Sequence, residues 1–318
     1  MHPFRTILFA ADFSINSKEA FRVACSLAVE NKTRLIVVHV VEPNWVPDQP
    51  VYLHDPTVAF VPTSDEGHIE ALRQKLRELY TPNYPIDVAY HITRGDAKAE
   101  ILSKASEIGS DLIVTGTHGL TGSHWLVAGS VAIAVLRGAH CPVMALRSRE
   151  VPYEAERTQH ILHPTDFSPA SEHALQVARS LAQDLGARLT ILHVEPLEII
   201  TGDTDDTEAA QLHAHDCQGV LEEMRTRLDG PDLKYPVETR ISRGFPPDGI
   251  LAMAAESRCQ VIVMGTHGRT GLLRSLMGSV AESVLSQAEC PVMIVKGAGV
   301  MATACDRNDN PVGADTEG

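Results

Sequence analysis

Two glycine-rich segments have the residue types and the spacing of a phosphate-binding loop. They span residues 116–130 and 265–279, and each reads G-x2-G-x9-G-S. Glycine has no Cβ, so its backbone can approach a ligand closely. A helix that begins at the serine would offer unpaired N–H groups and the positive end of its dipole to an anion. These residues therefore favour the binding of a phosphate group.

Other phosphate-binding motifs do not fit this pattern. No GK[ST] sequence follows the glycines, as a Walker A loop requires, and the GxGxxG dinucleotide motif belongs after a first strand. The rival interpretation is that the glycines only let a strand pack tightly against a helix. A single copy would leave these two interpretations even. The same spacing in two copies favours phosphate binding.

Five sequence blocks occur twice in the same order, which indicates a duplication. The paired blocks are Ile7–Ser14 with Ile161–Ser168, Arg34–Pro43 with Arg188–Pro196, Ile92–Gly95 with Ile241–Gly244, Asp111–Gly119 with Gln260–Gly268, and Cys141–Arg147 with Cys290–Lys296. Each block is a short apolar run bounded by Gly, Pro or Asp, as expected for a strand buried on both faces.

Helical periodicity separates the predicted strands. Ser168 and Pro169 have the types expected of an N-cap and a first helical residue. An apolar stripe at three- and four-residue spacing follows in each copy. Its members are Ala174, Ala178, Leu181 and Ala182 in the second copy, and Ala20, Ala24, Leu27 and Ala28 in the first.

Alternating strands and helices predict an α/β fold: two tandem, doubly wound, five-stranded parallel-sheet domains of Rossmann-like form. The predicted segments are a first domain at 1–147, a linker at 148–159, a second domain at 160–296 and a disordered tail at 297–318. Ligands of such sheets bind beyond the carboxyl ends of the strands, where the winding reverses. Here that means after the first, second and fourth strands of each copy.

The composition narrows the classes of partner. The 318 residues carry a net charge of -14, which disfavours nucleic acid and anionic membrane surfaces. We find no segment with the pattern of a signal peptide or a membrane span. The six cysteines are scattered without a CxxC pair, as is typical of reduced thiols in a cytosol. We therefore expect a cytoplasmic protein.

The glycine pattern, an aspartate after the first strand and a Cys-Pro-Val block before the last strand together resemble the universal stress protein family. The resemblance covers both copies and is to the tandem type, in which two such domains are fused. It implies an adenine nucleotide alpha hydrolase-like fold and a site for ATP, AMP or ADP, with or without Mg²⁺. The aspartate and backbone groups after the second strand would hold the adenosine, and the glycine loop and serine would hold the phosphates.

The resemblance assigns ligand-binding positions in both copies. In the second copy they are Pro164, Thr165, Asp166, Val194, Met264, Gly265, Gly268, Arg269, Gly278, Ser279 and Val280. In the first copy they are Asp12, Val40, Gly116, Gly119, Gly129, Ser130 and Val131.

The two copies differ in ways that bear on affinity. Arg269 and Arg274 of the second glycine loop could donate charge-assisted hydrogen bonds to phosphates, whereas the first loop has Leu120 and Trp125 at these places. In addition, the first copy has alanines at 10 and 11 where the second has Pro164 and Thr165. We therefore expect the second copy to bind nucleotide more tightly.

Several histidines are candidates for catalytic or metal-binding roles. His118 and His267, within the glycine loops, are expected to fix the loop rather than to catalyse, and His39 and His193 are expected to be buried structural residues. His213, His215 and Cys217 could form half of a zinc site, although a solvated helix surface is the favoured interpretation.

No GxSxG, HExxH or catalytic Cys–His signature occurs, so no catalytic or metal-binding residue is assigned. The expected function is that of a stress-response sensor or adaptor that binds nucleotide. A slow ATPase and an interaction scaffold with vestigial pockets remain as alternatives. The two domains are expected to form an intramolecular pseudo-dimer, which the resemblance implies is made through the fifth strands, Val143–Arg147 and Val292–Lys296, and association into a homodimer is left open.

Overall fold

The computed structural model describes residues 4–42, 65–117, 129–147, 158–196, 217–226, 235–266 and 277–297. Its first half contains β1 (Thr6–Ala11), α1 (Ile15–Asn31), β2 (Arg34–Val41), α2 (Asp65–Leu79), β3 (Val88–Arg94), α3 (Ala97–Glu107), β4 (Leu112–Gly116), α4 (Ser130–Gly138) and β5 (Val143–Leu146). Its second half contains β6 (His160–Thr165), α5 (Pro169–Leu185), β7 (Arg188–Glu195), a helix at 217–226, β8 (Val237–Arg243), α7 (Pro246–Glu256), β9 (Val261–Gly265), α8 (Ser279–Gln287) and β10 (Val292–Val295).

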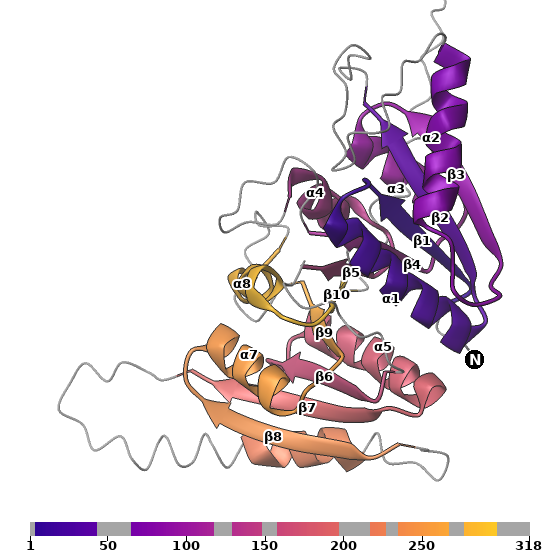
Figure 1. The fold of residues 1–318 in the computed structure, drawn as a ribbon. Helices are drawn as coiled ribbons and strands as arrows, with labels where there is room; N and C mark the ends of the chain where they lie inside the picture. The colour runs from indigo at the N-terminus through magenta and orange to yellow at the C-terminus, as the bar shows by residue number, and fades with distance from the viewer. Residues whose placement is uncertain are drawn as a thin grey trace, which may run out of the picture.

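All ten strands belong to one sheet, in the order β3-β2-β1-β4-β5-β10-β9-β6-β7-β8 (Figure 1). Strands within each half are parallel, and the order reverses between β1 and β4 and between β6 and β9. The predicted pair of doubly wound five-stranded α/β units is thus confirmed. The two five-stranded sheets are continuous with each other, because β5 and β10 pair antiparallel.

Helices cover both faces of the sheet, and an apolar core lies on each face. One core packs α1, α2, α5 and the helix at 217–226, and the other packs α3, α4, α7 and α8. Neighbouring residues of a strand alternate between the two cores: Phe9 of β1 points into the first, and Leu8 into the second. This two-sided burial explains the uniformly apolar strand sequences.

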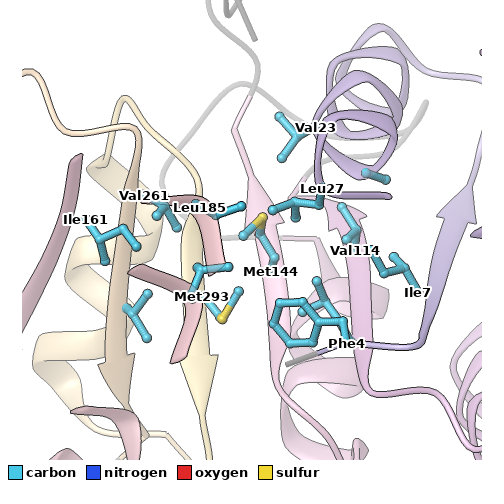
Figure 2. Close-up of a cluster of buried hydrophobic side chains, with 14 of the residues drawn as sticks. Phe4, Ile7, Val23, Leu27, Val114, Met144, Ile161, Leu185, Val261 and Met293 are labelled. Carbon is cyan, nitrogen blue, oxygen red and sulfur yellow. The ribbon is translucent and has the colours of Figure 1, made fainter. Parts of the chain in front are cut away.

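Each core runs across the junction between the halves. Met144 of β5 pairs with Met293 of β10, and both methionines belong to the first core. Figure 2 shows the two methionines in one cluster with Leu27 of α1 and Leu185 of α5. The predicted contact between the fifth strands is therefore present.

Two basic side chains reach across the same junction. Lys296, after β10, donates from Nζ to the carbonyls of Arg137 and Ala139 at the end of α4, at 2.6 Å each. At the equivalent place in the other half, Arg147 donates from Nη1 to the carbonyl of Ser286 near the end of α8, at 2.8 Å. Cations at helix C-termini satisfy carbonyls that have no helical partner. The exchange of contacts between the two halves is thus reciprocal.

The predicted helix starts and apolar stripes are confirmed. Ser168 is the N-cap of α5, with Pro169 as its first residue, and the side chain of Ser168 accepts from the N–H of Ser171. All eight alanine and leucine residues of the two predicted stripes are buried.

Some predictions concern residues outside the described ranges. These are the linker at 148–157, the tail at 298–318, the glycine-loop positions Gly119, Gly268 and Arg269, and His118, Leu120, Trp125, His213, His215, His267 and Arg274. Among the residues that the structure does describe, no helix has the length and apolar character needed to span a membrane.

Candidate functional site

The ligand-binding positions assigned in the first half lie at one level along the carboxyl edge of the sheet. Ala11, the last residue of β1, pairs with His39 of β2, so Asp12 is level with Val40. On the other side of β1, Ala10 pairs with Thr115 of β4. Gly116 therefore follows at the level of Ala11. Because parallel strands share a carboxyl edge, these positions border the point where the winding reverses.

The second-half positions have the same arrangement. Thr165 of β6 pairs with His193 of β7, which brings Asp166 level with Val194. On the other side, β6 is parallel to β9, and continuing the register from the pair Leu162 and Ile262 brings Gly265 level with Thr165. The assigned positions after the first, second and fourth strands thus come together in both halves.

Asp12 shapes the turn between β1 and α1. Its Oδ1 accepts from the backbone N–H of Ser14 at 2.9 Å, and Ser14 in turn is the N-cap of α1. Phe13, between them, has φ of 63°, in the left-handed region that side chains rarely adopt. A carboxylate that accepts two residues ahead stabilises such a turn.

The turn between β6 and α5 repeats this geometry. Asp166 accepts from the N–H of Ser168 at 3.1 Å, and Phe167 has φ of 62°. Both aspartates are half-buried, with one oxygen committed to the turn. The aspartate assigned to ligand binding therefore also has a structural role.

The histidines at the ends of β2 and β7 hold these turns in place. His39 bonds through Nδ1 to the carbonyl of Ala11 at 2.8 Å, and His193 bonds in the same way to Thr165 at 2.9 Å. Their rings lie 4.3 Å and 4.6 Å from those of Phe13 and Phe167. His193 is buried as predicted, whereas His39 is only half-buried, and the hydrogen bonds agree with a structural role for both.

Gly265 has a packing role at the end of β9. A Cβ built there would lie 2.9 Å from the backbone carbon of Ala170 and 3.1 Å from the N of Ser171, in the first turn of α5. At Gly116 the nearest atom, Cβ of Asn16, would be 3.3 Å away. The first glycine of each loop thus has a packing role, and the space for a Cβ is smaller at Gly265 than at Gly116.

The last glycines of the loops, Gly129 and Gly278, are the N-caps of α4 and α8. Gly278 donates its N–H to the carbonyl of Thr266 at 2.6 Å, and Gly129 donates likewise to Thr117. These bonds join the two ends of each glycine loop. Glycine has no side chain, so the first helical N–H groups receive no cap from the N-cap residue itself. Such a helix start suits an anion.

The assigned side chains differ in exposure. Ser130 and Ser279, the first helical residues of α4 and α8, are exposed. Half-buried positions are Asp12, Val40, Gly116, Gly129, Val131, Asp166, Gly265, Gly278 and Val280. Buried positions are Pro164, Thr165, Val194 and Met264. The exposed and half-buried positions therefore lie at the carboxyl ends of the strands and at the starts of α4 and α8.

Beneath the first turn lies a hydroxyl that the sequence did not reveal. Tyr80, fully buried, accepts from the N–H of Phe13 at 3.0 Å and donates to Oγ of Ser17 at 2.9 Å. Burial raises the pKa of Tyr80 to about 12. The only sequence signal was the Asp-Phe-Ser triplet common to both copies, which marks the turn but not its buried partner.

The second turn uses different groups. Thr165 accepts through Oγ1 from the N–H of Phe167 at 3.1 Å and from Oγ of Ser171 at 2.8 Å. His163 lies below, with Nδ1 bonded to the carbonyl of Val263 at 2.8 Å. Complete burial lowers the pKa of His163 to about 4. The imidazole is therefore neutral at physiological pH.

Of the suggested zinc ligands, the structure describes Cys217. It lies in the helix at 217–226 and is buried, so the prediction of a solvated helix surface is wrong for this residue. Its predicted companions lie outside the described residues. Among the described side chains, no three His, Cys, Asp or Glu residues cluster as a metal site would need.

Comparison with known proteins gives one consistent family. The family model described as "Universal stress protein family" matches residues 3–147 and 157–296. A universal stress protein of Mycolicibacterium smegmatis is 28% identical over 294 residues, covering 91% of this chain and 96% of its own length. The structure of a universal stress protein from Archaeoglobus fulgidus covers 92% of this chain and 98% of that one, with a TM-score of 0.62 and 21% identity. That similarity is one of fold.

A universal stress protein crystallised in complex with cAMP also matches, over 45% of this chain, at 22% identity and a TM-score of 0.35. The bound cAMP is a property of that protein. The family model matches this chain twice. The two matched segments have the same strand order and the same strand-to-helix turn, and in each a helix begins after an N-cap glycine. The chain belongs to the universal stress protein family.

Proposed function

We propose that the chain binds ATP or a related adenine nucleotide, and that it acts as a stress-response sensor or adaptor. One observation carries the proposal: the N-cap of α8 is Gly278, which has no side chain to satisfy the first helical N–H groups, and the first helical residue, Ser279, is exposed. Its N–H groups and dipole favour a phosphate. The carboxyl edge of β6, where Asp166 lies level with Val194, would hold the adenosine. Arg269 and the remaining assigned residues are part of the proposal.

We propose that the second half is the stronger site. Arg269 and Arg274 supply cations to its loop, where the first loop has Leu120 and Trp125. One charge acts in the opposite direction: Glu282 lies in the first turn of α8, and α4 has no acid there. Glu282 is exposed, so solvent and salt screen its repulsion of a phosphate. Two arginines therefore outweigh it.

Ligand-dependent stabilisation of the full chain tests nucleotide binding. A ligand that binds only the native state raises the melting temperature with concentration. We expect ATP, ADP or AMP to raise it and GTP to have a smaller effect, and we expect mass spectrometry to detect an adenine nucleotide carried through purification. No shift with any adenine nucleotide would contradict the proposal. Analysis of the bound nucleotide after incubation with ATP separates a binding protein from an ATPase.

The junction between β5 and β10 leads to a related proposal about assembly. The antiparallel pairing of these strands, with Lys296 and Arg147 reaching across, gives the fused chain the arrangement of a dimer within one molecule. It would then have no fifth-strand edge left for another copy. Sedimentation is expected to give the mass of one chain, 34.5 kDa. A stable species of twice that mass would show that a further interface exists.

A cytoplasmic location completes the proposal. The chain has six scattered cysteines, and none of the five that the structure describes forms a disulfide. Reduced thiols are usual in a cytosol. Cell fractionation tests the location, and recovery outside the cytoplasm would contradict it.

A further inference from the structure

Two cysteines of the second half lie in sulfur contact. Cys259 lies between α7 and β9, and Cys290 lies between α8 and β10. Their Sγ atoms are 3.7 Å apart. Backbone bonds hold both positions: the N–H of Cys259 bonds to the carbonyl of Ala254 at 3.1 Å, and Ile262 bonds to the carbonyl of Pro291 at 3.0 Å. The contact is thus built into the pairing of two neighbouring strands.

The first half places a different pair at the same two positions. Oγ of Ser110 lies 3.6 Å from Sγ of Cys141, and these residues align with Cys259 and Cys290. The fold therefore brings the two positions together in both halves, but only the second half has a thiol at each. The first half is an internal control in which no bond between the two side chains can form.

The two thiols differ in their exposure to solvent. Cys259 is buried, with 7% of its surface exposed, whereas Cys290 is half-buried. The hydrogen bond with Cys290, together with burial, raises the pKa of the Cys259 thiol. An oxidant in solution therefore meets Cys290 first, and Cys259 stands behind it at contact distance.

We propose that Cys259 and Cys290 form an oxidation site that reacts with hydrogen peroxide to give an intramolecular disulfide. The sulfur of Cys290 attacks the peroxide, the O–O bond breaks, and one water leaves as a sulfenic acid forms. The sulfur of Cys259 then attacks that of Cys290, the S–O bond breaks, and a second water leaves. Two thiols lose two electrons and two protons in total, and hydrogen peroxide is reduced to two waters.

The geometry suits the second step. A disulfide bond is about 2.05 Å long, so the two sulfurs must approach by about 1.7 Å from their present 3.7 Å. The closed segment, 259–290, contains β9, the second glycine motif and α8. Linking its ends restricts the unfolded chain, so the oxidised protein is expected to melt roughly 5–10 °C higher than the reduced protein.

Peptide mapping of the oxidised full chain tests the proposal. The reduced protein, with Cys305→Ser to remove the cysteine of the C-terminal segment, is treated with equimolar hydrogen peroxide and digested with trypsin without reductant. Arg269 and Arg274 lie between the two cysteines, so cleavage leaves them in separate peptides unless they are bonded. We expect a linked pair, two hydrogens lighter than the sum of the peptides, and Cys141 still as a thiol.

Matched variants distinguish the site from general thiol oxidation. Cys259→Ser reproduces the first-half arrangement, so Cys290 is expected to accumulate as a sulfenic acid that a dimedone probe traps. Cys141→Ser is expected to leave the link unchanged, and Cys290→Ser to abolish it. Should Cys259→Ser fail to fold, the mapping of the parent protein still decides. Cys290 oxidised beyond the sulfenic acid beside a free Cys259 thiol, or no linked peptide, would overturn the proposal.

Discussion

The two halves build the same strand-to-helix turn with different buried partners. In both, an aspartate bonds to the serine two residues on, and the phenylalanine between them is left-handed, at φ of 63° and 62°. The N–H of that phenylalanine, however, finds Tyr80 in the first half and Thr165 in the second. Its acceptor thus comes from the residue that follows α2 in one case and from the adjoining strand in the other.

The residue at the end of the first strand accounts for the difference. Ala11 has no hydroxyl, so the buried N–H of Phe13 needs an acceptor from elsewhere, and a buried donor without a partner costs free energy. Thr165 supplies its own hydroxyl, and the space beneath then holds His163 where the first half has Phe9. The backbone of the turn is fixed by local residues, while its buried polar contacts are replaceable.

The largest expected effect of this difference is on stability in acid. The folded-state pKa of His163, about 4, lies below the ordinary value of 6.5. The unfolded chain therefore binds more protons between these values, and the free energy of unfolding falls as the pH falls from 6.5 to 4. The contribution of His163 to this loss is about 3 kcal/mol. Urea unfolding of His163→Phe, which copies Phe9, is expected to show a flatter pH dependence across this window.

A second histidine with a lowered pKa, His160, is still present in the His163→Phe variant. Burial lowers its pKa as well, so some loss of stability in acid is expected to persist. An unchanged pH dependence in His163→Phe would mean that His163 is not held neutral by its burial. That result would remove the main chemical contrast between the halves.

Exchanging the hydroxyl that accepts from the N–H of Phe13 is expected to have the next largest effect on the free energy of unfolding. Tyr80→Phe removes the hydroxyl that serves Phe13, and should lower the free energy of unfolding by about 1–3 kcal/mol. Ala11→Thr places a hydroxyl where Thr165 has one, so the double variant should recover part of this loss. Denaturant unfolding of the parent, both single variants and the double variant measures the coupling. Purely additive effects would contradict the exchange.

The effect of a methyl group at the end of the fourth strand of each half should be smaller. Gly265→Ala brings a Cβ to 2.9 Å from the backbone of Ala170, whereas in Gly116→Ala the nearest contact is 3.3 Å. We expect a loss of about 1–2 kcal/mol at Gly265 and less than about 1 kcal/mol at Gly116. Thermal unfolding of the two variants checks this, and a larger loss at Gly116 would show that the packing is not tighter in the second half.

The sequence was sufficient for the parts of the fold that rest on local rules and on repetition. Apolar runs and helical stripes predicted the strands and helices, and Ser168 with Pro169 predicted the start of α5. The buried contacts of Tyr80 and His163 join residues 67 and 100 positions apart to the turn or to a neighbouring strand, and no local pattern encodes such pairs. For the same reason the sequence did not reveal that Gly265 packs against the first turn of α5, while its contact with a ligand stays a prediction.

The most direct test of the central claim is ATP titration of two matched variants by calorimetry. Gly278 and Gly129 cap α8 and α4 with φ of -73° and -54°, values that any residue can adopt, so valine there should block a ligand without straining the backbone. We expect Gly278→Val to remove the tighter binding event and Gly129→Val to leave it intact. Equal losses in the two variants, or a greater loss from Gly129→Val, would contradict the claim that the second half is the stronger nucleotide site.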